Sequence, residues 1–185
     1  LEGAVSNFLS GGLRSIVSVG MTLAAQPSFA ASAGEAADNE RRRQLVDLLD
    51  RHPAVEAAFV GYDDGRFFYA GRLSLLSIAQ REEFGAPDGE AIIVRSVEAG
   101  PGTRPETWWF VLPGGGTTPP RVHPTSFDPR QRPWYIDATN RKAPTLTEPY
   151  HFAWADEVGI SAGVPLRGGV LGFDFSFDTL DALIT

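Results

Sequence analysis

Apolar residues recur at helical spacing in two segments near the start of the chain. In residues 1–25 they are separated mostly by three or four positions, which predicts one long helix with a single buried stripe. Residues 36–51 form a second predicted helix, with Asp38 as a candidate N-cap, and the pair His52-Pro53 ends it. The apolar face of this second helix consists of Leu45, Leu48 and Leu49.

From residue 54 onward the apolar pattern changes to alternation and short runs, which are typical of β-strands. Strands are expected at residues 55–62, 66–71, 91–97, 107–112, 158–166 and 169–177. Asp63-Asp64-Gly65 is a tight-turn signal, so the first two strands are expected to form a hairpin. Short helices are expected at residues 75–83 and from Pro133 to about Asn140, whereas residues 141–158 are expected to be a loop.

Strands that are neighbours in sequence favour an antiparallel sheet, and the strand–helix–strand alternation of a parallel α/β fold is missing. We therefore expect an α+β fold with one antiparallel sheet of about six strands and the long N-terminal helix packed along it. The chain divides into a helical region (residues 1–53), a sheet module (54–178) and the start of a further helix (179–185).

Composition narrows the possible functions. A chain of 185 residues fits one domain, and its net charge of −7 disfavours binding to nucleic acid or to anionic membrane surfaces. The basic run Arg41-Arg42-Arg43 lies in the polar second helix and is interpreted as a solvated face. The absence of cysteine excludes disulfides, cysteine zinc sites and thiol catalysis.

The beginning of the chain suggests an excised piece of a longer protein, because Leu1 is not a start methionine. No stretch of the sequence reaches the roughly 18 uninterrupted apolar residues that a membrane-spanning helix needs. The segment from Arg14 to Ser32 loosely resembles a signal peptide, but serines and a glycine dilute its apolar run. An amphipathic helix is the favoured interpretation.

Motifs for catalysis are weak. The three histidines, His52, His123 and His151, are far apart and lack the spacing of metal ligands. Gly114-Gly115-Gly116 lacks the Lys-Ser/Thr of a phosphate-binding loop, and there is no Gly-x-Ser-x-Gly elbow. We expect no catalytic residues, no metal site and no cofactor, although a hydrolase of unknown type is kept as a minor alternative.

The segment Phe127 to Tyr135 is the most unusual part of the sequence. It places the guanidinium of Arg132 beside the large rings of Trp134 and Tyr135, at the start of a short helix that prolines help to fix. Such a cluster can bind a small molecule, with Arg132 holding a carboxylate or carbonyl. Alternatively it is purely structural, with Arg132 paired to Asp128 or to a backbone carbonyl.

The same segment, together with later motifs, resembles bacterial Cache domains of the double-Cache type. The matching residues are Phe127 to Tyr135, Ala138, Thr147-Glu148-Pro149-Tyr150, Gly159 to Pro165 and Gly169 to Ser176. The first hairpin, Val60 to Phe68, resembles that of Cache domains attached to adenylate/guanylate cyclases. The resemblance implies a PAS-like sheet in an extracytoplasmic sensor domain, tethered to the membrane in a longer receptor. The apolar residues at the start of the first helix, Leu1, Val5, Phe8 and Leu9, have little local sequence to pack on. This end is therefore expected to project from the domain and either to meet a second copy, giving a homodimer, or to continue toward the membrane.

The resemblance also implies a ligand site. Residues that match the amino-acid-binding relatives are Arg132, Trp134, Tyr135, Tyr150 and Asp174. Two positions depart from the pattern: Phe127 stands where a tyrosine is expected, and Phe152 where an acidic residue is expected. An uncharged ligand or an apolar carboxylate is therefore favoured over an ordinary α-amino acid.

The output domain and the role of ligand stay open. A cytoplasmic nucleotide cyclase is the favoured output, with a histidine kinase or a chemoreceptor as alternatives. The other interpretation is a ligand-independent dimerisation and spacer domain whose cavity is filled by its own side chains, in particular Phe127 and Phe152. Within the last predicted strand, alternation puts Asp174 on the face opposite Phe173 and Phe175, so Asp174 is expected to face inward.

Overall fold

In the computed structural model, the chain is described over residues 2–31, 34–153 and 155–177, with the side chains of the first helix described at Gly11 and from Arg14 onward. The helix expected to begin at residue 179 lies outside the described residues. The helices are α1 (Glu2–Ala24), α2 (Glu35–Arg51), α3 (Ile78–Phe84) and α4 (Pro133–Arg141). Single 3-10 turns lie at η1 (Pro27–Phe29), η2 (Leu73–Leu75) and η3 (Pro129–Gln131).

The described strands form one antiparallel sheet of nine strands. Their order across the sheet is β5-β4-β3-β2-β1-β9-β8-β6, with β7 also paired to β8. The strand bounds are β1 (Ala57–Tyr62), β2 (Phe67–Arg72), β3 (Ile92–Val97), β4 (Arg104–Val111), β5 (Arg121–Thr125), β6 (Thr145–Leu146), β7 (Tyr150–His151), β8 (Val158–Leu166) and β9 (Gly169–Ser176). The α+β class and the antiparallel sheet are confirmed.

All six strands expected from the sequence are present, but the expected number was too low. The three that were missed are β5, β6 and β7. Strand β5 lies at one edge of the sheet and contains Pro124, which an edge strand tolerates because its missing N–H is not needed for a second neighbour. Strands β6 and β7 have two residues each, too short to show any alternation.

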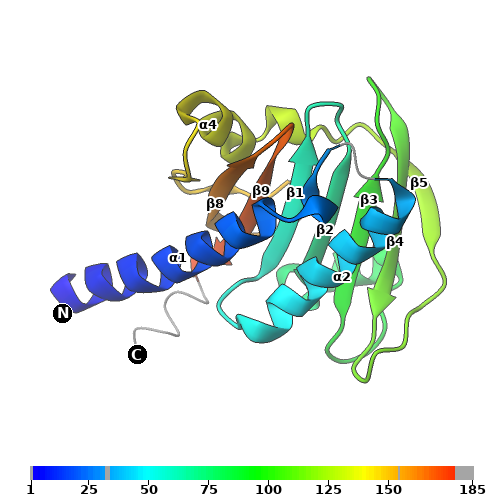
Figure 1. The fold of residues 1–185 in the computed structure, drawn as a ribbon. Helices are drawn as coiled ribbons and strands as arrows, with labels where there is room; N and C mark the ends of the chain where they lie inside the picture. Colours follow the sequence, from blue (N-terminus) through cyan, green and yellow to red (C-terminus); the bar gives the residue numbers. More distant parts are fainter. Residues whose placement is uncertain (1, 32–33, 154, 178–185) are drawn as a thin grey trace.

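Alternating side chains give the sheet two apolar faces, each with its own core. Helices α1 and α2 cover one face, where Phe68 and Phe173 lie among Leu45, Leu49 and other buried side chains. Figure 1 shows these two helices in front of the sheet. The other face carries Phe59, Phe67 and Tyr69, which pack against Trp134 at the start of α4. The central strands therefore contribute to both cores, as period-two alternation requires.

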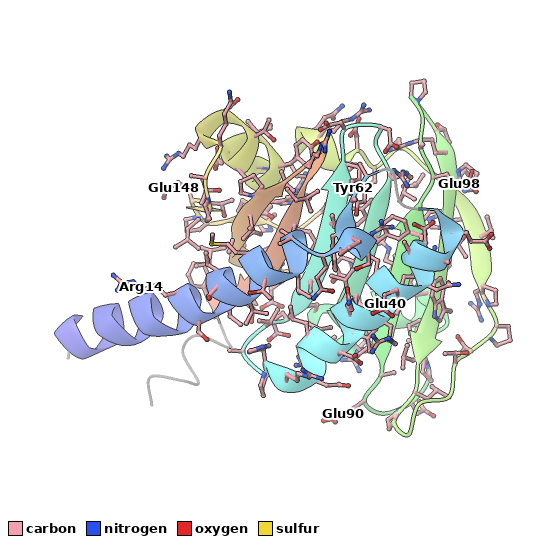
Figure 2. All side chains as sticks on the ribbon, in the orientation of Figure 1. Arg14, Glu40, Tyr62, Glu90, Glu98 and Glu148 are labelled. Atoms are coloured by element: carbon pink, nitrogen blue, oxygen red, sulfur yellow. The ribbon has the colours of Figure 1, made fainter. Side chains whose placement is uncertain are left out.

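Helix α1 is long, as predicted, and its second half packs on the sheet. Ile16 is buried, and Gly20 lies so close to β8 and β9 that a Cβ there would be 2.8 Å from the ring of Phe173. The N-terminal part of α1 projects beyond the edge of the sheet (Figure 1), and Arg14 points into solvent (Figure 2). The projection is confirmed; the side chains of Leu1, Val5, Phe8 and Leu9, which were expected to meet a second copy, lie outside the described residues.

Two expectations for α2 are wrong. The helix begins at Glu35 with Gly34 as N-cap, so Asp38 lies in its first turn instead of capping it. Asp38 forms an ion pair with Arg41 at 2.5 Å. Arg41 is not solvated: it is fully buried between α2 and the sheet. Arg43 does face solvent, as expected.

The burial of Arg41 has a clear physical basis. Its guanidinium carbon lies 5.0 Å from the ring centroid of Tyr62 and 4.6 Å from that of Phe68, a distance at which a cation is attracted to an aromatic face. It also donates to the carbonyl of Ala30, and the hydroxyl of Tyr62 donates to the carbonyl of Phe29. Figure 2 shows Tyr62 beside the connection between α1 and α2. These contacts fix that connection to the sheet.

Candidate ligand-binding site

The segment that leads into α4 is held in place by its own residues. The carboxylate of Asp128 accepts hydrogen bonds from the backbone N–H and the guanidinium of Arg130, with the closest ion-pair distance at 2.8 Å. The hydrogen bonds from Arg130 lower the pKa of Asp128, although burial acts in the opposite direction. Asp128 is therefore paired with Arg130, and the interpretation that pairs it with Arg132 is wrong.

Trp134 anchors this segment to the sheet. Its side chain is buried, with the ring centroid 4.7 Å from that of Phe59. The backbone of β1 permits this approach at Gly61, where a Cβ would lie 2.7 Å from Pro129 and 3.0 Å from Trp134. A larger residue at position 61 would push the whole segment away from the sheet.

Tyr135 points to a different place from Trp134. Its hydroxyl donates to the carboxylate of Asp63, in the turn between β1 and β2, at 2.6 Å. Burial is the largest cause of the raised pKa of Tyr135, and the hydrogen bond to Asp63 acts in the same direction. Tyr135 therefore ties α4 to the β1–β2 turn and does not line the cavity described below.

Asp174 is buried in β9, as alternation predicts. Only 4% of its surface is exposed, and its carboxylate accepts a hydrogen bond of 2.5 Å from the hydroxyl of Ser161 on β8. That hydroxyl also lies 2.7 Å from the hydroxyl of Tyr150. Burial raises the pKa of Asp174 to about 7, despite the opposing effects of Ser161 and Arg132. Asp174 can thus exchange a proton near neutral pH.

Arg132 lies at the outer side of this group. It is half-buried, and its guanidinium carbon is 5.6 Å from the ring centroid of Tyr150. One of its nitrogens donates to the backbone carbonyl of His151 at 3.3 Å. The carbonyl pairing that the sequence left open is therefore present. The positive charge still acts on Asp174, whose pKa it lowers.

These residues enclose a small cavity of about 10 Å³. A volume of this size holds about one water molecule. Its walls are formed by Phe59, Phe67, Tyr69, Phe127, Arg132, Trp134, Tyr150, Phe152, Ala153 and Asp174. We call this space the motif cavity.

The walls of the motif cavity include six of the seven residues predicted for the site, all except Tyr135. Sequence reasoning missed the wall from the first hairpin, namely Phe59, Phe67 and Tyr69, and it missed Ser161. Alternation along β2 puts Phe67 and Tyr69 on one face, which was the available signal. The segment between α4 and β8 supplies Tyr150 and Phe152 to the wall of the motif cavity.

A larger hollow of about 650 Å³ lies elsewhere, beside η2 and the turn between β4 and β5. Arg72 in its wall already donates to the carbonyl of Leu49, in the last turn of α2, and to that of Val55, between α2 and β1. None of the residues predicted for the site lines this hollow. We therefore place the candidate site at the motif cavity, where Arg132, Asp174 and the aromatic rings converge.

Within residues 2–31, 34–153 and 155–177, no group of three acidic or histidine side chains is placed to hold a metal ion. Across the same residues, none of the helices combines the length and the apolar character that a membrane crossing requires.

Solved structures with this architecture are ligand-binding domains of bacterial chemoreceptors. The ligand-binding domain of PctC from Pseudomonas aeruginosa PAO1, in complex with GABA, superposes with a TM-score of 0.59 at 19% identity, covering 99% of this chain and 64% of that one. The ligand-binding domain of Tlp3 from Campylobacter jejuni, in complex with 4-methylisoleucine, gives a TM-score of 0.60 at 14% identity, covering 98% of this chain and 56% of that one. The chain has the Cache-type, PAS-like sensor fold that its sequence predicts.

Sequence comparison adds an adenylate cyclase and a chemotaxis protein to the similar proteins. Adenylate cyclase 1 of Rhizobium meliloti (strain 1021) is 35% identical over 147 residues, which cover 77% of this chain and 22% of that protein. The methyl-accepting chemotaxis protein McpG of Pseudomonas putida is 38% identical over 73 residues, covering 38% of this chain and 12% of that protein. No family model matches the chain. The matched region spans about a fifth or less of these relatives.

Proposed function

We propose that this domain is the extracytoplasmic small-molecule sensor of a bacterial transmembrane receptor that controls a cytoplasmic nucleotide cyclase. The observation that carries the ligand-binding part is the convergence of Arg132 and Asp174 on one aromatic cavity. A guanidinium supplies directional donors for an acceptor, and the rings supply apolar contact. The similarity to an adenylate cyclase over 77% of the chain supports the cyclase output.

The ligand that fits these residues best is a small apolar carboxylate or a related uncharged molecule. Arg132 is the cationic side chain in the cavity wall, and Phe127 and Phe152 add apolar surface instead of a hydroxyl and a second acid. GABA and L-glutamine, the ligands of the PctC and PctB domains, are therefore useful comparison compounds, with the charged amino acids expected to bind less well.

A second candidate is a ligand-independent spacer and dimerisation domain. The observation that favours it is the size of the motif cavity, which is about 10 Å³ and is closed in part by Phe127 and Phe152. A chemoreceptor output is the alternative to a cyclase, supported by the shorter match to McpG. Either output is consistent with the same domain, because the Cache-type fold itself carries no output chemistry.

The test is a thermal-shift screen of small carboxylates, amino acids and amines, followed by calorimetry. A ligand at about 100 times its Kd stabilises the folded domain by ~2.7 kcal/mol, which is readily measured. We expect Arg132→Ala to abolish binding of a carboxylate hit, whereas Arg141→Ala, which changes an exposed arginine at the end of the same helix, leaves binding unchanged. Unchanged binding to Arg132→Ala contradicts the site, and a screen without hits favours the spacer function.

A further inference from the structure

The loop that closes the motif cavity places a large apolar side chain inside it. We call residues 147–153, which lead from β6 toward β8 and include β7, the strap. Phe152 is the only strap side chain that is both aromatic and buried, with 5% of its surface exposed, whereas its neighbours His151 and Ala153 are exposed. A phenylalanine is buried here because its ring enters the space between Tyr150 and the sheet, at a centroid distance of 5.5 Å from Tyr150.

The sheet makes room for this ring at one position. A Cβ added to Gly159 on β8 would lie 2.5 Å from Cζ of Phe152, closer than any real contact. The backbone N–H of Phe152 donates to the carbonyl of Glu157 at 3.0 Å, which fixes the residue from the other side. The ring is therefore seated in a defined place and is not loosely folded over the opening.

The volume that remains is too small for a ligand. The motif cavity holds about one water molecule at 10 Å³, whereas cavities that bind an aromatic molecule such as benzene measure on the order of 150 Å³. Removal of the phenyl ring of Phe152 from this wall would supply a large part of the difference between these two volumes. An organic ligand can therefore enter this site only if a wall side chain moves, and Phe152 is the buried aromatic side chain that the strap contributes to the wall.

Arg132 contacts the strap next to Phe152. Its guanidinium donates to the carbonyl of His151, the residue before Phe152, and lies over the ring of Tyr150. Both partners belong to the strap, so Arg132 holds it against the site. A carbonyl is also the weaker acceptor for a guanidinium, because a carboxylate forms charge-assisted and bidentate hydrogen bonds.

We propose that the strap occupies the ligand site of the free domain, with Phe152 as the internal occupant and Arg132 as its latch. A ligand with a carboxylate takes Arg132 away from the His151 carbonyl and displaces the Phe152 ring, so the strap moves when ligand binds. Phe152 then determines specificity: the site accepts a carboxylate attached to an apolar group of about the size of a phenyl ring. This inference rests on the proposed sensor function, and it identifies the strap as the element whose two positions ligand would bias.

The latch can be tested on the ligand-free domain, so the result does not depend on finding the natural ligand. Amide hydrogen exchange, read by mass spectrometry, is compared among the wild-type domain, Arg132→Ala and the control Arg141→Ala. We expect strap peptides that contain the Phe152 amide to exchange about tenfold faster in Arg132→Ala, with unchanged exchange in β1 and β9. Exchange in Arg141→Ala should equal that of the wild type. Equal strap exchange in Arg132→Ala and wild type would overturn the latch.

The internal occupant is tested with benzene as the probe. Phe152→Ala opens a cavity next to Tyr150 and Trp134, and we expect benzene to raise the melting temperature of this variant but not that of the wild type. Phe152→Leu, which keeps an apolar side chain and is easier to fold, should respond to a smaller extent. Absence of any benzene response in folded Phe152→Ala and Phe152→Leu would show that the ring does not fill the site. A failed ligand screen with a positive benzene response refutes the proposed ligands but leaves the internal occupant in place.

Discussion

Arg41 and Asp174 are both ionisable side chains in the interior, and the protein stabilises them in different ways. The guanidinium of Arg41 is paired with Asp38 and faces two aromatic rings. Asp174 has a hydroxyl partner in Ser161 and only the more distant charge of Arg132, so burial raises its pKa to about 7. The first is a permanent part of the fold, whereas the second can change its protonation.

We predict that Arg41→Ala destabilises the domain by about 3 kcal/mol or more. The substitution removes the fully buried partner of an ion pair with the partly exposed Asp38, and it leaves a gap against Tyr62 and Phe68. Urea unfolding followed by circular dichroism measures the change in the free energy of unfolding. Arg43→Ala is the matched control on the same helix. Because Arg43 is exposed, the stability of this variant should be close to that of the wild type.

A loss in Arg41→Ala no larger than that in Arg43→Ala would contradict the role of the buried pair. The further variant Asp38→Ala separates the two contributions, because it leaves the cation between the rings but removes the carboxylate. We expect the free energy of unfolding of Asp38→Ala to lie between that of the control Arg43→Ala and that of Arg41→Ala.

The raised pKa of Asp174 predicts how stability depends on pH. An acid with a pKa near 3.8 in the unfolded chain and about 7 in the folded domain is protonated more strongly in the folded state between these values. Stability from this residue is therefore highest below about pH 4, falls as pH rises toward 7, and is constant above. The substitution Asp174→Asn keeps the shape of the side chain, but asparagine cannot ionise.

We expect the free energy of unfolding of Asp174→Asn, relative to the wild type, to rise between pH 4 and pH 7. A tenfold difference in proton affinity between the folded and unfolded states corresponds to about 1.4 kcal/mol. Urea unfolding at four pH values across this range measures the difference between the two proteins, in which contributions from all other groups cancel. A difference that is constant with pH would show that Asp174 has an ordinary pKa.

At the scale of elements, α1 depends on glycine at one position and only tolerates it at another. A Cβ at Gly20 would meet the buried ring of Phe173 at 2.8 Å, because α1 crosses β8 and β9 there. A Cβ at Gly11 would meet nothing within 4 Å. The same substitution should therefore have opposite effects in one helix.

We predict that Gly20→Ala destabilises the domain by about 1–2 kcal/mol through overpacking. Gly11→Ala should stabilise it by up to about 1 kcal/mol, since alanine is the better helix former. Thermal unfolding of the two variants beside the wild type measures both effects. If Gly20→Ala is at least as stable as Gly11→Ala, α1 does not pack on the sheet at this point.

Element boundaries also mark the limit of local sequence information. The long helices and six of the strands follow from periodicity, since each has enough residues for a pattern. Strands β6 and β7 exist because β8 offers them partners, with Thr145 opposite Gly163 and Tyr150 opposite Gly159. No feature of two residues can predict such a pairing.

At the scale of the whole molecule, the projecting part of α1 has no sheet to pack on within the described chain. Val5 and Phe8 are apolar residues of this part of the sequence, and we propose that they meet a second copy of the domain. In such a dimer, the proposed movement of the strap would be passed to the rest of the receptor as a change in the position of the paired helices.

We expect the domain to sediment as a dimer and Phe8→Glu to convert it to a monomer, because a charge in an apolar helix interface is costly. Arg14→Ala, which alters an exposed side chain on the same helix, should remain dimeric. Sedimentation velocity over a range of concentrations measures this. A monomeric wild type, or a dimer that survives Phe8→Glu, contradicts pairing through α1.

The sequence by itself predicted the fold class and six of the ten residues that line the motif cavity. Alternation and helical spacing are local properties, so they specify the helices, the six longer strands and the inward direction of Asp174. Phe127, Arg132 and Trp134 lie within eight positions of one another, so their backbones are close in space, but Tyr135 in the same run points elsewhere. Only the tertiary structure decided which residues face them.

The walls from Phe59, Phe67 and Tyr69, the pairing of Tyr135 with Asp63 and the burial of Arg41 all join residues far apart in the chain. The same holds for the ring of Phe152 in the cavity, which depends on the absence of a side chain at Gly159 on β8. The physical reason is that burial and pairing depend on the register and packing of distant elements, which one strand or helix cannot specify alone.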